Sequence, residues 1–191
     1  LLGKADAIGY AVCHRIEVRS FTIGTRQFPL CARCTGQFMG VLLALGYLTV
    51  VGKRGMGTPN RAVSIGLAVL VLAYLVDGLN SYLHLSPLQS AFPQLPRLYQ
   101  PNNTLRLLTG TGAGLVIGTS VYLAFNSTAW RRPNPQSALK NLASLGLLFF
   151  LALLMDGLIL LEIPAVMYPL AILSALATLT VLALVYTIVI L

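Results

Sequence analysis

The sequence predicts an all-α integral membrane protein, a bundle of about five transmembrane helices preceded by an amphipathic, cysteine-rich segment at the membrane interface. Three observations predict this class. First, 57% of the 191 residues are hydrophobic and only 9% are charged, whereas a soluble domain carries about 25% charged residues. Second, the apolar residues gather in long runs, and the mean hydropathy is +0.80. Third, the basic residues behind the net charge of +8 sit in short clusters between those runs, which is typical of membrane-flanking charges and argues against a nucleic-acid partner.

Residues 1–35 are predicted to be the interfacial segment. Five apolar residues recur at the spacing of one helical face, and they are Leu2, Ala5, Ile8, Val12 and Ile16. This pattern predicts a short amphipathic helix. Gly24 and Pro29 then predict turns in the stretch that follows. Since the chain begins Leu1-Leu2 and not with Met, we expect further residues, with room for another span, upstream.

Residues 36–191 are predicted to form the transmembrane bundle. Its five spans are expected at about 36–51, 62–83, 105–125, 138–161 and 165–191. Cys34 or Thr35 is expected near the N-cap of the first span, and Asn102-Asn103-Thr104 before the third. The first span is short for a helix that crosses about 30 Å of hydrocarbon.

The third span carries Gly110, Gly114 and Gly118 on one face. Small residues at this spacing let two helices approach closely in lipid. A phosphate-binding glycine loop is disfavoured, because the pattern lies inside an apolar helix and follows no strand. We therefore predict a helix-packing face.

Five alternating spans decide which segments share a membrane face. The N-terminal segment, the 84–104 loop and the 162–164 turn lie on one side, named face A; the 52–61 and 126–140 loops and the C-terminus lie on the other, named face B. Face A holds all five acidic residues with seven basic ones, and face B holds six basic residues and no acid. Short basic loops favour the cytoplasmic side, so loops 52–61 and 126–140 are predicted to be cytoplasmic.

Asp77 and Asp156 both fall near face A, inside predicted spans. An ionisable side chain within a span usually faces a cavity or a partner. We therefore expect one polar cavity open to face A, with Asp77 and Asn103 as candidate catalytic residues that orient a ligand or a water. In the alternative, the two aspartates sit at the interface and pair with Arg106 and a loop arginine.

The three cysteines predict a metal site, with zinc as the expected ion. Cys31-x2-Cys34 is a chelating pair, and Cys13 and His14 would complete a Cys3His set. Cys13 and His14 are adjacent, so their side chains diverge; three cysteines with Asp77 or water are the other zinc arrangement. Packed, reduced cysteines remain an alternative without metal.

A thiol reaction is a separate hypothesis for Cys31 and Cys34. Cys34 lies at a helix N-terminus, where the dipole and free amides stabilise a thiolate. A CxxC at the end of a span is typical of quinone-linked thiol oxidases, although such relays need a second dithiol and only Cys13 is left. A structural disulfide fits if face A is outside.

Arginines near face A predict an anion-binding site. Arg15, Arg19, Arg26, Arg33 and Arg106 are expected to converge with the N-termini of the first and third spans. Of these, Arg15, Arg19, Arg33 and Arg106 are expected to hold the anion, together with Asn102 and Asp156. Arginine forks and free helix amides suit phosphate, so the expected ligand is an anionic lipid or an isoprenoid phosphate. The alternative is simple anchoring to lipid headgroups, and His84 is expected to be a solvated loop residue.

Several motifs occur in a fixed order along the first two thirds of the chain. They are Cys13-His14-Arg15, Arg19-Ser20-Phe21, Pro29-Leu30-Cys31-Ala32-Arg33-Cys34-Thr35-Gly36, Asp77-Gly78 and Asn102-Asn103-x-Leu105-Arg106-x2-Thr109-Gly110-x3-Gly114. This order resembles an uncharacterised prokaryotic membrane-protein family, domain of unknown function 2085, over roughly residues 10–120. The resemblance implies a polytopic membrane fold and groups the motif residues, but implies no activity. Asp156 and the fifth span lie outside it.

Taken together, the sequence predicts a polytopic membrane protein with a zinc-type site and an arginine-lined cavity that binds or processes an anionic lipid-like ligand. Two alternatives come from other classes. One is a membrane thiol oxidoreductase using Cys31 and Cys34. The other is a non-catalytic subunit of a membrane complex, in which the cluster holds the N-terminal segment against the bundle.

Overall fold

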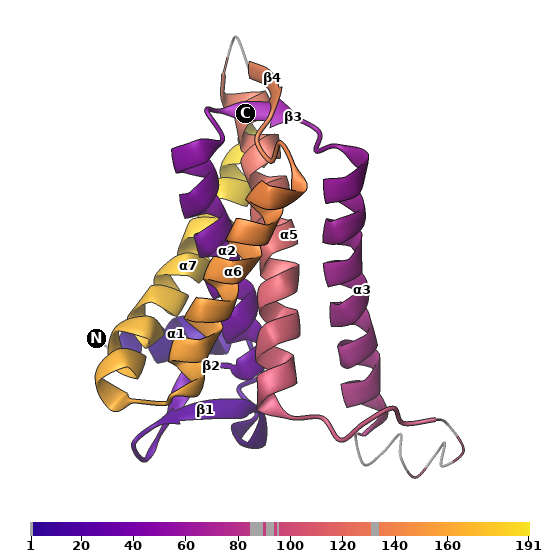
Figure 1. Ribbon diagram of the computed structural model, residues 1–191. Coiled ribbons are helices and arrows are strands. Elements are labelled where there is room, and N and C mark those ends of the chain that lie inside the picture. Colours follow the sequence, from indigo (N-terminus) through magenta and orange to yellow (C-terminus); the bar gives the residue numbers. More distant parts are fainter. Residues whose placement is uncertain (1, 85–89, 91–93, 95, 131–133) are drawn as a thin grey trace.

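The computed structural model describes residues 2–84, 90, 94, 96–130 and 134–191 and is mostly helical (Figure 1). Within these residues, five helices are long and apolar enough to cross a membrane, as predicted. They are α2 (Ala32–Val51), α3 (Arg61–Leu83), α5 (Asn103–Ala129), α6 (Leu142–Leu160) and α7 (Pro164–Ile190). Parts of the predicted 84–104 and 126–140 loops, at 85–89, 91–93, 95 and 131–133, lie outside the described residues.

Asparagine side chains fix the starts of three spans. The side chains of Asn60, Asn102 and Asn141 accept hydrogen bonds from the backbone N–H three residues onward, at the N-termini of α3, α5 and α6. Each bond satisfies one of the helix's free N–H groups. Because Asn141 is the cap, α6 begins at Leu142, and the expectation of a start near residue 138 was wrong.

The first span also begins earlier than predicted. Cys31 is the N-cap of α2, and Cys34 and Thr35 lie inside the helix. The added residues make α2 20 residues long, which gives about 30 Å at a rise of 1.5 Å per residue. The span is therefore long enough to cross the bilayer, with Cys31 as its N-cap and Cys34 in its first turn.

The N-terminal segment contains a β-hairpin that the all-helical prediction missed. Helix α1 (Leu2–Val12) and a 3-10 turn (Glu17–Arg19) are followed by antiparallel strands β1 (Ser20–Ile23) and β2 (Arg26–Cys31). Gly24 makes the predicted turn, with a φ of +62°. Pro29 lies within β2 instead of forming a turn; a two-stranded hairpin consists of edge strands, where a missing N–H is tolerated.

A second small sheet joins the two loops at the opposite end. Strands β3 (Gly55–Gly57) and β4 (Asn134–Ser137) pair in parallel. Figure 1 shows this sheet and the C-terminus at one end of the bundle, and the β1–β2 hairpin at the other. The two ends correspond to face B and face A, so the helices alternate as the sequence predicts.

Helices α2 and α5 pack closely through glycines. A Cβ added to Gly110 would lie 2.3 Å from the carbonyl oxygen of Arg33, and one added to Gly114 would lie 2.2 Å from that of Gln37. Gly118 faces Val41 and Ala44 in the same way. The predicted packing face is confirmed, and it sets the first turn of α2 directly against α5.

Candidate metal and anion site

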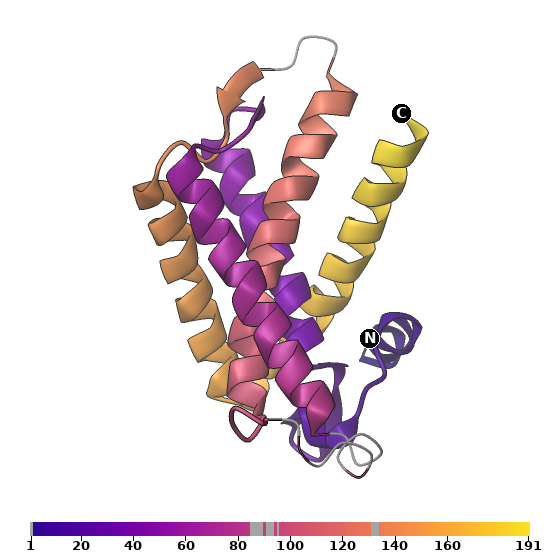
Figure 2. The same cartoon turned by 90° about the vertical axis from the view of Figure 1, so that its right-hand side faces the viewer.

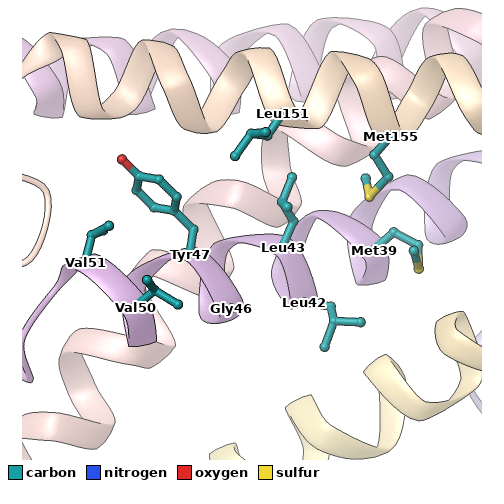
Figure 3. Close-up of a pocket in the computed structure, with 9 residues that line it drawn as sticks. All are labelled: Met39, Leu42, Leu43, Gly46, Tyr47, Val50, Val51, Leu151 and Met155. Carbon is teal, nitrogen blue, oxygen red and sulfur yellow. The ribbon is translucent and has the colours of Figure 1, made fainter.

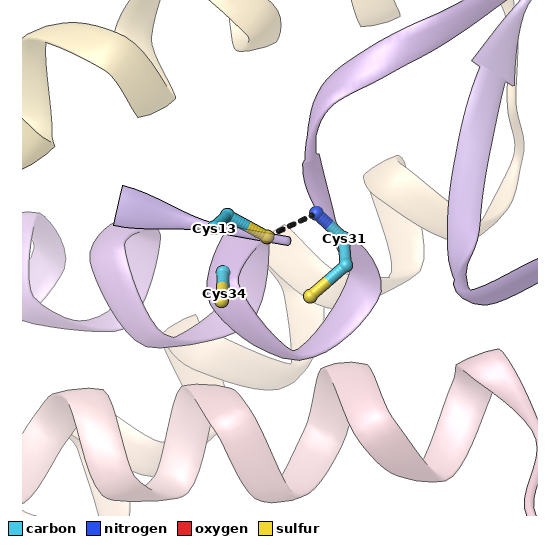
Figure 4. A group of neighbouring side chains, drawn as sticks. All are labelled: Cys13, Cys31 and Cys34. Carbon is cyan, nitrogen blue, oxygen red and sulfur yellow. Dashed lines mark hydrogen bonds between the residues drawn. The ribbon is translucent and has the colours of Figure 1, made fainter. Parts of the chain in front are cut away.

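Three cysteines from different elements meet at the face A end of the bundle. Cys13 follows α1, Cys31 ends β2, and Cys34 lies in the first turn of α2 (Figure 4). All three are unbridged thiols, and their sulfur atoms lie within 4.8 Å of one another. The hairpin produces this meeting, because β2 returns the chain to the level of Cys13 before α2 begins.

The backbone around the cluster is arranged to stabilise negative sulfur. The N–H groups of Cys31 and Arg15 point to the Sγ of Cys13, at 3.4 and 3.5 Å. Arg15 has a φ of +48°, and this left-handed conformation turns the chain back over the sulfur. Cys31 and Cys34 meanwhile occupy the positive end of α2, where a helix dipole favours thiolate.

Because the three thiols are close together, hydrogen bonds between them give them different pKa values. Hydrogen bonds from the thiols of Cys31 and Cys34 hold the pKa of Cys13 far below its usual range. The shared hydrogen bond with Cys13 raises the pKa of Cys31. Three thiolates at this distance repel one another, and a divalent cation relieves that repulsion.

The donor set fits zinc. Zinc binds thiolate sulfurs at about 2.3 Å in tetrahedral geometry, which places neighbouring sulfurs about 3.8 Å apart. Sulfurs within 4.8 Å of one another need only a small contraction to reach that spacing. His14 is exposed and is not one of the three side chains whose ligand atoms lie within 4.8 Å of one another. The structure therefore offers three ligands and leaves one coordination position for another group.

The cluster opens into a pocket of about 190 Å³. All three cysteines line it, and so does His14. The other charged lining residues are the four arginines singled out from the sequence, Arg15, Arg19, Arg33 and Arg106. Thiol and guanidinium groups therefore share one cavity.

Two of these arginines have acidic partners and two do not. Arg15 pairs with Asp6 at 3.0 Å, and Arg33 pairs with Asp77. Among the residues that the structure describes, no acid pairs with Arg19 or Arg106. A buried cation without a counter-ion is costly, so Arg19 and Arg106 carry the unbalanced positive charge of the pocket.

Arg106 is the most buried of the four arginine residues. Only 7% of it is exposed, and its Nη1 donates to Asn103 Oδ1 at 3.0 Å. Its buried Nε has no hydrogen-bond partner in the described part of the chain. Asn103 thus orients Arg106, while Asn102 serves as the helix cap and does not line the pocket.

A second pocket of about 380 Å³ lies on the other side of the unpaired arginines. Arg19 and Arg106 line it together with Val18, His84, Gln100 and Pro101. His84 is only partly buried, and its Nδ1 lies 2.8 Å from the carbonyl oxygen of Asn80. Arg19 and Arg106 are therefore reached from both pockets.

Asp77 supports the cavity wall without lining it. Its carboxylate is 1% exposed and accepts hydrogen bonds from Arg33 and from the Tyr99 hydroxyl, the latter at 2.7 Å. Arg33 also donates to Ser81 Oγ at 3.0 Å. Burial and the bond to Asp77 raise the pKa of Tyr99 to about 12, so this tyrosine stays a donor. Neither Ser81 nor Tyr99 was predicted as a site residue, although Ser81 follows Asp77 by one helical turn in α3.

Comparison with known proteins places this site within a family. Residues 13–120 match the model of a family described as predicted membrane protein, DUF2085. The chain belongs to this family. A protein from Methanothermobacter thermautotrophicus, described as uncharacterized, is 31% identical over 113 residues, which cover 58% of this chain and 86% of the relative. An uncharacterized protein from Methanocaldococcus jannaschii is 29% identical over 112 residues, which cover 58% of this chain and 62% of the relative. No solved structure matches.

The family region contains the cysteines, the four arginines and Asp77, but it ends before Asp156. The structure separates Asp156 from the pockets as well. Asp156 is 2% exposed and accepts one hydrogen bond, from Thr111 Oγ1 at 2.7 Å. It lines neither pocket of face A, so neither of these pockets is the expected cavity shared by both aspartates.

An apolar groove of about 590 Å³ also lies on the bundle, between α2 and α6 (Figure 3). Met39 and Tyr47 of α2 face Leu151 and Met155 of α6 across it. Its lining carries no charge. In a membrane-spanning protein, apolar grooves of this kind face lipid tails. The thiol and guanidinium groups of the family region lie instead at the cysteine–arginine pocket.

Proposed function

We propose that this membrane protein binds zinc through Cys13, Cys31 and Cys34, and that the zinc and the adjacent arginines bind an anionic lipid-like ligand, a lipid phosphate or an isoprenoid phosphate, at face A. One observation carries the proposal. Arg106 is buried without an acidic partner among the described residues, in the same pocket as three clustered thiols.

The charge balance supports an anion as the ligand. Three thiolates and Zn²⁺ together carry one negative charge. Asp77 pairs with Arg33, and Asp6 is shared between Arg15 and the exposed Arg26. Arg19 and Arg106 therefore remain as two positive charges of the pocket without an acidic partner among the described residues. A phosphate on these two arginines removes the surplus through charge-assisted hydrogen bonds, for which the guanidinium fork is well suited.

The fourth zinc position is the one at which the proposed site can carry out chemistry. A three-ligand zinc with an open position polarises a bound oxygen or activates water. Asp77 acts on the pocket through Arg33, and Asn103 acts through Arg106. Their predicted catalytic role is therefore better described as positioning the two arginines.

The orientation belongs to the proposal as well. With loops 52–61 and 126–140 cytoplasmic, face A and its pocket lie on the outer side of the membrane. The pocket lies at the N-termini of α2 and α5, at the level of the lipid headgroups. A ligand with a phosphate head and a hydrocarbon tail reaches such a site from the membrane plane.

The test measures binding of a short-chain phosphatidic acid to the purified full chain, with the matching diacylglycerol as the probe without phosphate. We expect Arg106→Gln and Arg19→Gln to weaken phosphatidic acid binding by about 10-fold or more, since a hydrogen bond to a charged group contributes about 1.5–3 kcal/mol. Arg97→Gln is the matched control, because Arg97 is at the same face but lines neither pocket. Equal binding of both probes, or equal loss in Arg97→Gln, contradicts the anion site.

The metal part is tested separately by X-ray absorption at the zinc edge. We expect three sulfur ligands and one lighter ligand in the wild type and in His14→Ala. A reversible Cys31–Cys34 disulfide in metal-free protein would instead support the thiol oxidoreductase.

A further inference from the structure

A third polar pocket, at face B, has a separate role. We propose that it binds one anionic phospholipid, with the phosphate held at Arg54 and Asn126 and an acyl chain lying between α5 and α7. The pocket measures about 520 Å³ and is lined from α2, α5, α7 and the turn before β3. It shares no residue with the cysteine–arginine pocket.

The mouth of this pocket is a fixed cationic group. Arg54 has a φ of +57°, and its backbone N–H donates to the Tyr122 hydroxyl at 3.2 Å. Its guanidinium lies 4.1 Å from the centre of the Trp130 ring. Trp130 in turn donates its Nε1–H to Asn126 Oδ1 at 3.0 Å. The charge is therefore held over the pocket by a chain of contacts that reaches α5.

This positive charge has no internal counter-ion among the described residues. No ion pair of Arg54 is formed there, and neither face B loop contains an aspartate or glutamate. A stacked guanidinium keeps its edge N–H groups free for a phosphate oxygen. The ligand is thus expected to bring the negative charge.

Asn126 is a second, independent observation that indicates a ligand. The residue lines the pocket and is only 4% exposed. Its Oδ1 accepts from Trp130, whereas its Nδ2 has no partner in the described part of the chain. A buried amide donor without an acceptor is costly, and a phosphate or glycerol-ester oxygen in the pocket supplies one.

The deeper part of the pocket fits a hydrocarbon chain. Its walls are Leu45 of α2, Phe125 of α5 and Leu184 of α7. Figure 2 shows α7 standing apart from α5 over the half of the bundle nearer face B. Within a bilayer, a space of this size between helices is filled, because protein and lipid interiors pack without large voids. A pocket with a polar opening and an apolar interior favours an amphiphile over a free anion.

If basic residues only anchored the protein to lipid headgroups, Arg54 and its basic neighbours would contribute alike to lipid binding. Such anchoring depends on charge near the surface. Lys53 precedes Arg54 and is exposed like Arg54, but it does not line the pocket. Lys53→Gln is therefore the matched control for Arg54→Gln.

The experiment is native mass spectrometry of the full chain released from micelles, titrated with phosphatidylglycerol or phosphatidylcholine. All variants carry Arg106→Gln, so that the proposed face A site does not contribute. We expect one retained phosphatidylglycerol, about 10-fold weaker binding in Arg54→Gln, and unchanged binding in Lys53→Gln. Leu184→Trp, which fills the apolar part of the pocket and leaves its charge unchanged, is also expected to lose the lipid.

Four results would overturn the proposal. Equal losses in Arg54→Gln and Lys53→Gln would show headgroup anchoring only. Equal retention of phosphatidylcholine, or lipid retention in Leu184→Trp, would remove the anionic amphiphile from this pocket. Competition of inorganic phosphate at concentrations equal to those of phosphatidylglycerol would indicate a site for the free anion.

Discussion

Arg33 and Asp77 join the first turn of α2 to the face A end of α3 through an ion pair whose carboxylate is 1% exposed. The same arginine is adjacent to Cys34 and lines the cysteine pocket. The second oxygen of Asp77 accepts from Tyr99. This pair therefore holds the arginine side of the pocket and fixes α3, which otherwise exposes most of its apolar side chains.

Asp77→Asn is predicted to destabilise the protein and to weaken phosphatidic acid binding. Breaking a buried ion pair by removing one partner costs about 3–5 kcal/mol, and we expect the lower end of that range because the Arg33 side chain is 21% exposed. Thermal denaturation in detergent checks this. Glu17→Gln is the control, since Glu17 is exposed and forms no ion pair among the described residues. Equal melting of the two variants would show that the Arg33–Asp77 pair contributes little.

Gly110→Ala is predicted to displace the first turn of α2. The new methyl group would lie 2.3 Å from the Arg33 carbonyl oxygen, and overpacking of this kind costs about 1–3 kcal/mol. We expect lower zinc content as well, because Cys34 follows Arg33. Gly146→Ala in α6 is the matched control, as its Cβ meets nothing within 4 Å. Full zinc content in Gly110→Ala would mean that α2 can shift without disturbing the cluster.

Asp156→Asn is predicted to leave both zinc content and phosphatidic acid binding unchanged. Asp156 contacts Thr111 and lines neither face A pocket. An asparagine can keep the hydrogen bond from Thr111, so stability should change by less than about 1 kcal/mol, a usual value for one neutral hydrogen bond. Titration with phosphatidic acid measures this. A 10-fold loss of binding would restore Asp156 to the site.

Chelation of the metal is predicted to loosen the N-terminal segment and spare the bundle. Zinc would tie Cys13 to Cys31 and Cys34, and metal binding is linked to local folding. Without it, α1 keeps the contact of Gly9 with Pro29 and the ion pairs of Asp6. Hydrogen exchange should rise in residues 2–31 on chelation and stay constant in α5. Uniform exchange throughout the chain would argue against a metal that holds this segment.

The spans and their order could be predicted from the sequence because hydropathy reports directly on burial in lipid. The four arginines of the pocket were also predicted, since helix alternation places them at face A. The hairpin was not, because β1 and β2 are short and Pro29 reads as a turn residue. The local sequence pattern does not show that an edge strand of a two-stranded hairpin tolerates this proline.

Pairing between side chains was harder to predict than placement. The sequence offered Arg106 as a partner for an aspartate, whereas in the structure Arg33 pairs with Asp77. Depth along a span did not reveal that Asp156 faces Thr111 and not the cavity. Both outcomes depend on helix rotation, which a nearly uniform apolar sequence leaves open.

The zinc content of the purified full chain tests the central claim most directly. Elemental analysis of protein prepared without chelator should give one zinc per chain in the wild type and in His14→Ala. It should give almost none in Cys13→Ser, Cys31→Ser or Cys34→Ser. Wild-type protein that contains no stoichiometric metal and has three freely titrating thiols would contradict the claim.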